Sequence, residues 1–242
     1  MNSNLTRILV CFVFLLGVPA RSQAQTDDGQ LQFRTLGWGV VADDLFYDLG
    51  GKNVPLVVKD AARSAFYSHP RTERLVFFRL VPGPEQKLVR QNVAEAEVGA
   101  AGEWPLLIFL QNEAGAALPY RVVALTDDLR SFPPSACRFI NLTPVELRVV
   151  VGEDKFSLSP RAMHQINLGL DPAAPPQMRY AAIGLFNEQG ARRLYGNNWA
   201  FRPNQRTLVV IFPQDGGMQL NRIVDDVRSY AAPAAASLPA AR

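Results

Sequence analysis

The sequence predicts an all-β protein, built as two tandem β-sandwich units of about 95 residues each after a cleaved signal peptide. Segments of strand length that are rich in Val, Ile, Phe and Tyr recur along the chain, and Pro or Gly interrupts them at short intervals. This alternation is typical of all-β sandwiches and barrels. Hydrophobic residues make up 48% of the chain and charged residues 19%, so the composition can form a core and excludes a disordered chain.

The N-terminus has the pattern of a secretory signal. Arg7 supplies a positive charge, residues 8–18 (ILVCFVFLLGV) are all apolar or Gly, and Ser22-Gln23-Ala24 offers small residues around a cleavage site. A helix of this apolar length spans about 16 Å, too short for the ~30 Å hydrocarbon core of a bilayer. We therefore expect cleavage of residues 1–24 and export to the periplasm or the exterior, with no transmembrane anchor in the mature chain.

The charge balance makes nucleic acid an unexpected partner. The chain has 25 Lys and Arg against 22 Asp and Glu, a formal net charge of +3. Cleavage would remove Arg7 and Arg21 and lower this charge by two. No run of five or six like charges occurs in the sequence, whereas a nucleic-acid-binding protein needs a clustered basic face.

A repeated motif predicts that the chain is a tandem duplication. Residues 126–132 (TDDLRSF) recur as residues 224–230 (VDDVRSY), 98 positions later, and residues 108–112 (IFLQN) match residues 211–215 (IFPQD), 103 positions later. The difference between the two offsets falls in a loop around residues 113–118, where length changes are tolerated. The predicted organisation is a linker at residues 25–33, unit 1 at 34–132, unit 2 at 133–230, and a disordered Ala/Pro tail at 231–242.

Both units divide into short strands separated by turns. In unit 1 we expect strands at residues 45–48, 54–59, 74–80, part of 87–98, 106–111 and 120–125, and a weak helical pattern only at residues 59–67. In unit 2 we expect strands at residues 137–142, 146–151, 155–158, 164–168, 178–186, 193–195, 199–201, 207–212 and 218–224. Gly152 lies at the turn of a predicted hairpin because it can adopt positive φ.

Each unit resembles the immunoglobulin-like sandwiches of exported bacterial proteins, with an opening strand such as residues 138–142 (RFINL). The resemblance implies a fold of about seven strands per unit, and it implies no binding residue because fold alone does not define function. Cys137 has no partner once the signal is removed, so the antibody-type disulfide is excluded and a small buried side chain is expected there.

No catalytic, cofactor or metal-binding signature is present in the sequence. His69 and His164 are the two histidines, too few for a three-histidine metal site, and neither has a sequence context that marks a nucleophile pair. The pairs Asp127-Asp128 and Asp225-Asp226 could hold calcium, but we expect them to cap turns and pair with arginine at the end of each unit. Calcium binding by these pairs stays open, and no cofactor is expected.

The strongest candidate for ligand binding is a stretch of four residues, Tyr195, Asn197, Asn198 and Trp199. Aromatic rings can stack on sugars, and asparagine amides can bond sugar hydroxyls. The alternative is that Trp199 faces the core, since it alternates with Phe201 along one strand.

These observations favour an exported, non-enzymatic structural or protein-interaction module of the cell envelope or exterior. A carbohydrate-binding module that uses exposed aromatic residues is the alternative, and a hydrolase with an unrecognised site is the second alternative. Envelope proteins or polysaccharide are the corresponding partners. A cleft between the units lined by His69, His164 and carboxylates would favour the hydrolase.

Overall fold

The computed structural model describes residues 29–187, 190–214 and 217–230. The predicted signal peptide and Ala/Pro tail lie outside the described residues. Within them the all-β prediction is confirmed, since sixteen strands form four sheets of four strands, accompanied by two short 3₁₀ helices.

Unit 1 is a sandwich of two four-stranded sheets, with strand orders β4-β1-β7-β8 and β3-β2-β5-β6. Below, these are called the inner and the outer sheet of unit 1. The elements are β1 (Gln30–Trp38), β2 (Ala42–Leu49), β3 (Lys52–Val58), β4 (Tyr67–Pro70), β5 (Arg74–Pro82), η1 (Pro84–Gln86), β6 (Leu88–Glu97), β7 (Pro105–Gln111) and β8 (Tyr120–Thr126).

Unit 2 has the same construction, with an inner sheet β12-β9-β15-β16 and an outer sheet β11-β10-β13-β14. Its elements are β9 (Ala136–Asn141), β10 (Leu147–Val151), β11 (Asp154–Leu158), β12 (Met163–Asn167), β13 (Gln177–Asn187), β14 (Gly190–Phe201), β15 (Gln205–Gln214), β16 (Gly217–Asp226) and η2 (Val227–Tyr230).

Every strand of unit 1 corresponds to the strand eight places later in unit 2. In both units the first and seventh strands pair in parallel, β1 with β7 and β9 with β15, while the other pairs are antiparallel. The identical strand order in both halves supports the duplication that the repeated motif predicts.

The strand pairing corrects one detail of the predicted alignment. Pro105 of β7 pairs with Thr126, and Thr207 of β15 pairs with Val224. With Thr126 matched to Val224, Pro105 corresponds to Thr207, so the sequence match between β7 and β15 is one residue out of register. Both strands are nearly continuous apolar runs, and letter identity cannot fix the register of such runs, although a one-residue shift exchanges the two faces of a strand.

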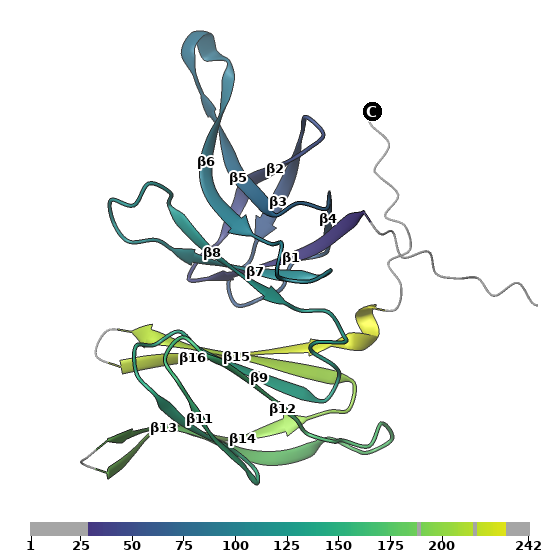
Figure 1. Cartoon of the computed structure of the whole chain (residues 1–242), viewed down its shortest axis with the longest axis vertical. Helices are drawn as coiled ribbons and strands as arrows, with labels where there is room; N and C mark the ends of the chain where they lie inside the picture. Colours follow the sequence, from purple (N-terminus) through teal and green to yellow (C-terminus); the bar gives the residue numbers. More distant parts are fainter. Residues whose placement is uncertain (1–28, 188–189, 215–216, 231–242) are drawn as a thin grey trace, which may run out of the picture.

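The four sheets stack as layers, with the two inner sheets in the middle (Figure 1). Each sandwich encloses its own hydrophobic core, and a third core lies between the two inner sheets. The central strands β7 and β15 are therefore buried on both faces, which explains their continuous apolar sequence. The units form one packed body rather than two domains joined by a linker.

The core between the units is made from the same structural positions in both. By the strand pairing, Leu36 of unit 1 corresponds to Ile140 of unit 2, and Leu106 corresponds to Leu208. All four side chains belong to this core. Two equivalent surfaces that face each other in this way define an isologous interface, the arrangement found in two-fold symmetric dimers. The units are therefore related by an approximate two-fold axis that passes between the inner sheets.

The structure corrects two predictions about unit 1. Residues 30–33, predicted as linker, pair with β4 and begin the inner sheet of unit 1, because Leu31 and Phe33 are apolar and pack into the core. The weak helical pattern at residues 59–67 does not form a helix: a turn follows β3, and residues 63–66 are irregular before β4.

Candidate functional site

A buried network of arginines and aspartates joins the two units at one end of their interface. Arg206 at the start of β15 is 1% exposed. Its guanidinium donates to Asp127 Oδ2 and to Asp225 Oδ2, each at 3.0 Å, and to the backbone carbonyls of Asp127 (2.7 Å) and Phe132 (3.0 Å). One side chain of unit 2 thus binds both copies of the repeated motif.

Three further arginines surround the same two carboxylates. Arg63 pairs with Asp127 at 3.1 Å and approaches Asp225 at 3.7 Å, and Arg34 lies 3.8 Å from Asp225. Burial lowers the pKa of Arg138 to about 10, with Asp127 opposing this shift and the neighbouring Arg206 adding to it. The cluster brings together more guanidinium groups than buried carboxylates.

Asp225 remains ionised in this environment. Burial by itself raises its pKa, but the Arg63 guanidinium, the Tyr230 hydroxyl bond and Arg206 outweigh burial and hold the pKa below its ordinary value. A carboxylate whose charged form is favoured in the folded state stabilises that state above the unfolded pKa.

The network follows the approximate two-fold axis. Arg138 of unit 2 lies over the ring of Phe132, at 4.2 Å, and Arg34 of unit 1 lies over the ring of Tyr230, at 5.0 Å. Arg34 and Arg138 occupy equivalent positions, as do Phe132 and Tyr230. The last aromatic ring of each unit therefore packs against an arginine of the other unit. Arg206 contacts both rings and has no arginine counterpart, since Trp104 occupies its equivalent position.

The second aspartate of each motif caps a turn. Asp128 Oδ1 accepts from the backbone N–H groups of Arg130 and Ser131, each at 2.8 Å, and Asp226 accepts from the backbone N–H and the guanidinium of Arg228. The expected boundary role of the motif agrees with these contacts. Calcium binding by the pairs stays a hypothesis, and no three His, Cys, Asp or Glu side chains gather in the described part of the chain.

A second feature is the β5–β6 hairpin, which rises above the rest of unit 1 (Figure 1). Its tip has two consecutive non-glycine residues with left-handed backbone, Glu85 (φ 57°) and Gln86 (φ 59°). Gly83 is required beside them, because a Cβ there would lie 2.6 Å from a methyl group of Val89. The hairpin nevertheless exposes apolar side chains, with Leu88 at 64% and Val89 at 40%.

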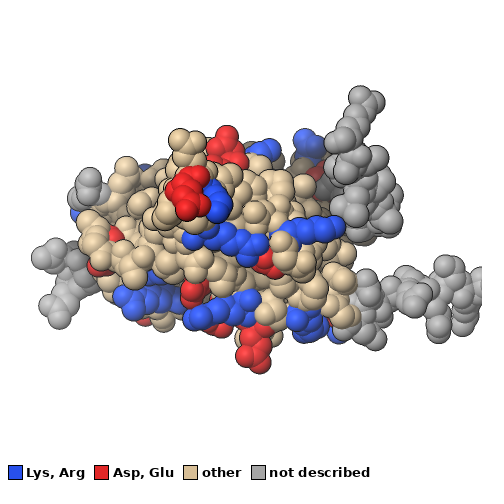
Figure 2. Space-filling model, turned by 90° about the horizontal axis from the view of Figure 1, so that it is seen from above, with Lys and Arg blue, Asp and Glu red and all other residues tan. Residues whose placement is uncertain are grey.

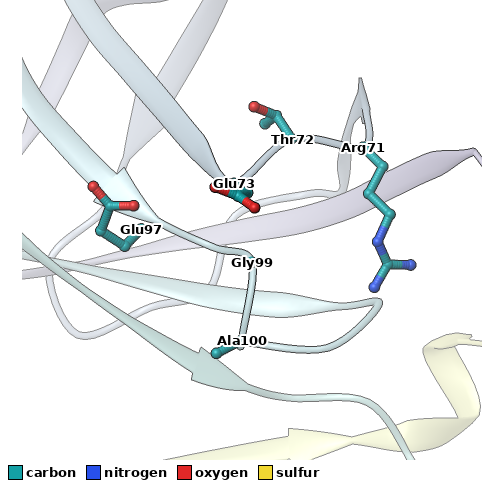
Figure 3. A pocket seen from close by; sticks show the side chains of 6 residues that line it. All are labelled: Arg71, Thr72, Glu73, Glu97, Gly99 and Ala100. Atoms are coloured by element: carbon teal, nitrogen blue, oxygen red, sulfur yellow. The ribbon is translucent and has the colours of Figure 1, made fainter.

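An open groove of about 620 Å³ lies where β5 begins and β6 ends. Figure 3 shows that the guanidinium of Arg71 and the carboxylates of Glu73 and Glu97 point in different directions. Glu97 is also engaged by Arg74 at 2.9 Å. These charged groups do not converge on a common point as a catalytic set would.

The four residues predicted to bind sugar lie on β14 but do not share one surface. Trp199 is 2% exposed and packs in the core of unit 2, where its Nε1 donates to the Tyr195 hydroxyl at 2.7 Å. Tyr195 is half-buried, whereas Asn197 and Asn198 are exposed. The Trp199 ring offers no open face in this conformation, so ligand binding by this set stays a prediction.

A polar groove of about 640 Å³ lies beside this stretch, at one end of unit 2. It is bordered by the β10–β11 turn, the end of β12 and the start of β13. Arg179 crosses it and donates to the Leu168 carbonyl at 3.0 Å and to Gln177 Oε1 at 3.3 Å. The other polar residues that line it are Glu153, Asp154, Asn167 and Tyr180.

The histidines and Cys137 occupy structural positions. His69 lies on β4 at the edge of one inner sheet, and His164 lies on β12 and stacks on Phe156 at 4.1 Å between ring centroids. Apolar side chains and ion pairs fill the space between the units, where the hydrolase hypothesis required a cleft. Cys137 is buried, and burial raises the pKa of its thiol.

Sequence reasoning missed the inward arginines. Arg138 and Arg206 stand in strand segments that are otherwise apolar, and a charge in such a strand is a signal of a buried ion pair. In the described residues, no helix is long and apolar enough to cross a membrane.

No protein-family model matches the chain, and no curated protein matches it. Among solved structures, the paired C2 domains of extended synaptotagmin 2 are similar at 11% identity, covering 92% of this chain and 99% of that one, with a TM-score of 0.20. A Bacteroides uniformis protein assigned to cell adhesion is similar at 10% identity, covering 84% and 99%, with a TM-score of 0.19. Scores this low carry no argument, and the β-sandwich fold rests on the chain's own strand pairing.

Proposed function

We propose that this chain is an exported, non-enzymatic interaction protein of the cell envelope or exterior, and that the β5–β6 hairpin contacts its partner. We also propose that both units are related to the immunoglobulin-like modules of exported bacterial proteins. The observation that carries it is the apolar side chain of Leu88, exposed on an ordered hairpin that extends beyond the sheets.

The hairpin is suited to binding because its two strands stay paired as far as Pro82 and Leu88, which limits the conformations of its tip. The Gly83 N–H donates to the Lys87 carbonyl at 2.8 Å, and Lys87 Nζ pairs with Glu85 at 2.8 Å across the tip. A preordered loop loses less conformational entropy on association than a flexible one. The two strands of the hairpin belong to the outer sheet of unit 1 and continue into the packed core of that unit.

The exposed side chains indicate the chemistry of the partner. Leu88 and Val89 are adjacent exposed apolar side chains, which suit an apolar surface on another protein. Seen from the hairpin end, basic and acidic side chains are interspersed over the molecule (Figure 2), so the partner needs both signs of charge around that apolar surface. Envelope proteins are the class we expect.

Site-specific photo-crosslinking of the full chain in the cells that produce it tests the proposal. A crosslinking residue at Leu88 should give one discrete adduct, whereas the same residue at Met163, an exposed apolar side chain on β12, should give none. The substitution Leu88→Asp should abolish binding of the identified partner without unfolding the chain, because exposed substitutions usually change stability by less than about 0.5 kcal/mol. Identical adducts at both positions, or none at Leu88, would contradict the proposal.

Export is tested separately by N-terminal sequencing. The mature protein should be recovered from the periplasm or medium and should begin at Gln25. An uncleaved N-terminus in the cytoplasm would refute export.

A further inference from the structure

An apolar cavity opens between the two sheets of unit 2, where β14 of the outer sheet stands opposite β16 of the inner sheet. Its volume is about 190 Å³. The buried side chains of Ile183 and Ile211 line its floor, and the half-buried side chains of Leu194, Met218 and Leu220 line its mouth. All five side chains belong to the core of unit 2 or pack against it, so they face the same space.

The equivalent space in unit 1 is closed by three aromatic rings. The ring centroid of Phe109 lies 5.1 Å from that of Phe77 and 6.4 Å from that of Tyr120, and Arg79 Nη2 donates to the Tyr120 hydroxyl at 2.9 Å. The edge strands β6 and β8 are in contact there.

Unit 2 lacks the rings that close this edge. The strand pairing, with a bulge at the same place in β5–β6 and in β13–β14, gives the equivalents of Phe77, Phe109 and Tyr120 as Ile183, Ile211 and Met218. In the described part of unit 2, β14 and β16 do not close on each other as β6 and β8 do. The cavity is therefore a feature in which the two halves have diverged.

Two polar groups that unit 1 does not have lie beside this cavity. Tyr195 lines it, and its hydroxyl accepts from Trp199 Nε1 at 2.7 Å, which leaves the hydroxyl hydrogen to donate to a ligand. Arg222, the next inward residue on β16 after Leu220, lies about 7 Å further along the strand. Its guanidinium donates to the Ala200 carbonyl at 2.7 Å, so it reaches from β16 to the edge of β14. The equivalents of Tyr195 and Arg222 in unit 1 are Ala94 and Ala124.

Arg222 is a half-buried cation without an acidic partner among the described residues. Its Nε is buried and has no hydrogen-bond acceptor. Burial lowers the pKa of Arg222, and Cys137 and Tyr195 oppose this shift. A carboxylate held beside Tyr195 would supply the missing opposite charge and accept charge-assisted hydrogen bonds.

The cavity is suited to a slim apolar ligand. Because an apolar cavity of about 150 Å³ holds a benzene ring, a cavity of this size admits an alkyl segment of roughly six to eight carbon atoms. It is smaller than the sites of roughly 300–1,000 Å³ that take drug-sized molecules.

We propose that this cavity binds a medium-chain monocarboxylate, with the alkyl chain between Ile183 and Ile211 and the carboxylate between the Tyr195 hydroxyl and Arg222. The site is separate from the hairpin and does not depend on the interaction function proposed above. It uses Tyr195 of the set predicted on β14, but for an anion rather than for a sugar.

Titration calorimetry of the full mature chain with sodium octanoate tests this proposal. We expect saturable one-to-one binding, weaker by roughly tenfold or more for octan-1-ol, which has no charge, and for butanoate, whose chain is too short. Met218→Tyr, which restores the ring that unit 1 has at the equivalent position, should weaken octanoate binding by a similar factor. Arg222→Met, which keeps the apolar stem, should weaken octanoate binding but leave octan-1-ol binding unchanged.

The matched control is Met163→Tyr, the same substitution at an exposed position on β12, which should bind octanoate as the wild type does. Circular dichroism should show the same fold for every variant. Absence of saturable octanoate binding would overturn the proposal, as would undiminished binding by Met218→Tyr or by Arg222→Met. Binding of octylamine as tight as that of octanoate would also overturn it, because a cation cannot pair with Arg222.

Discussion

Replacing Arg206 by methionine should destabilise the whole protein, because this side chain ties the two units together. The substitution keeps the apolar stem but removes five hydrogen bonds, which go to Asp127, Asp225, the Phe132 carbonyl and the Tyr230 hydroxyl. Two buried carbonyl oxygens lose a donor, at about 1–3 kcal/mol each. Breaking one side of a buried ion pair costs about 3–5 kcal/mol.

We expect a loss of about 4 kcal/mol in the free energy of unfolding, the middle of the roughly 2–6 kcal/mol that the two carbonyls cost together, because the ion-pair cost is largely avoided. Arg63 still pairs with Asp127 after the substitution, which keeps the loss from being larger. For a protein of this size, each kcal/mol lowers Tm by about 2–4 °C, so Tm should fall by about 8–16 °C. Thermal unfolding followed by circular dichroism, and urea unfolding followed by tryptophan fluorescence, measure this change.

The matched control is Arg228→Met, which removes another arginine–aspartate pair from the same motif. Arg228 is exposed and pairs with Asp226, and exposed ion pairs contribute little, so Tm should hardly move. Arg206→Lys should fall between the two, because an ammonium cannot reproduce the forked geometry. If Arg206→Met unfolds within about 1 kcal/mol of the wild type, the network does not hold the units together.

Three further predictions follow from buried groups. Asp225→Asn should destabilise the protein at neutral pH, and the difference from the wild type should shrink below about pH 4, where the lowered pKa of Asp225 ceases to favour folding; urea titrations at several pH values check this, and a constant difference would contradict it. Trp199→Ala should cost about 3–5 kcal/mol, since the ring packs in the core of unit 2; a wild-type Tm for this variant would place the ring outside the core. Cys137 should resist a thiol reagent in the native mature protein and react once in denaturant, and rapid native labelling would refute its burial.

The strand content and the duplication could be read from the sequence because both depend on local signals. Alternation of apolar residues and turn residues marks strands, and the motif around Asp127 and Asp225 recurs because each copy ends a unit. The sequence predicts these two aspartates at a boundary, and the structure places them there.

The packing of one unit on the other could not be read in the same way. It depends on a second buried face of β7 and β15, and their apolar runs do not say what covers that face. The role of Arg206 depends on contacts 79 residues away in sequence.

The approximate two-fold axis has a geometric consequence for a chain whose halves have diverged. Because the two outer sheets face in opposite directions, a loop that extends from the outer sheet of unit 1 points away from the equivalent loop of unit 2. The β5–β6 hairpin belongs to the outer sheet of unit 1 and the equivalent strands β13 and β14 to the outer sheet of unit 2, with the two inner sheets between them. A partner bound at the β5–β6 hairpin would therefore lie on the opposite side of the molecule from any partner bound at the outer sheet of unit 2.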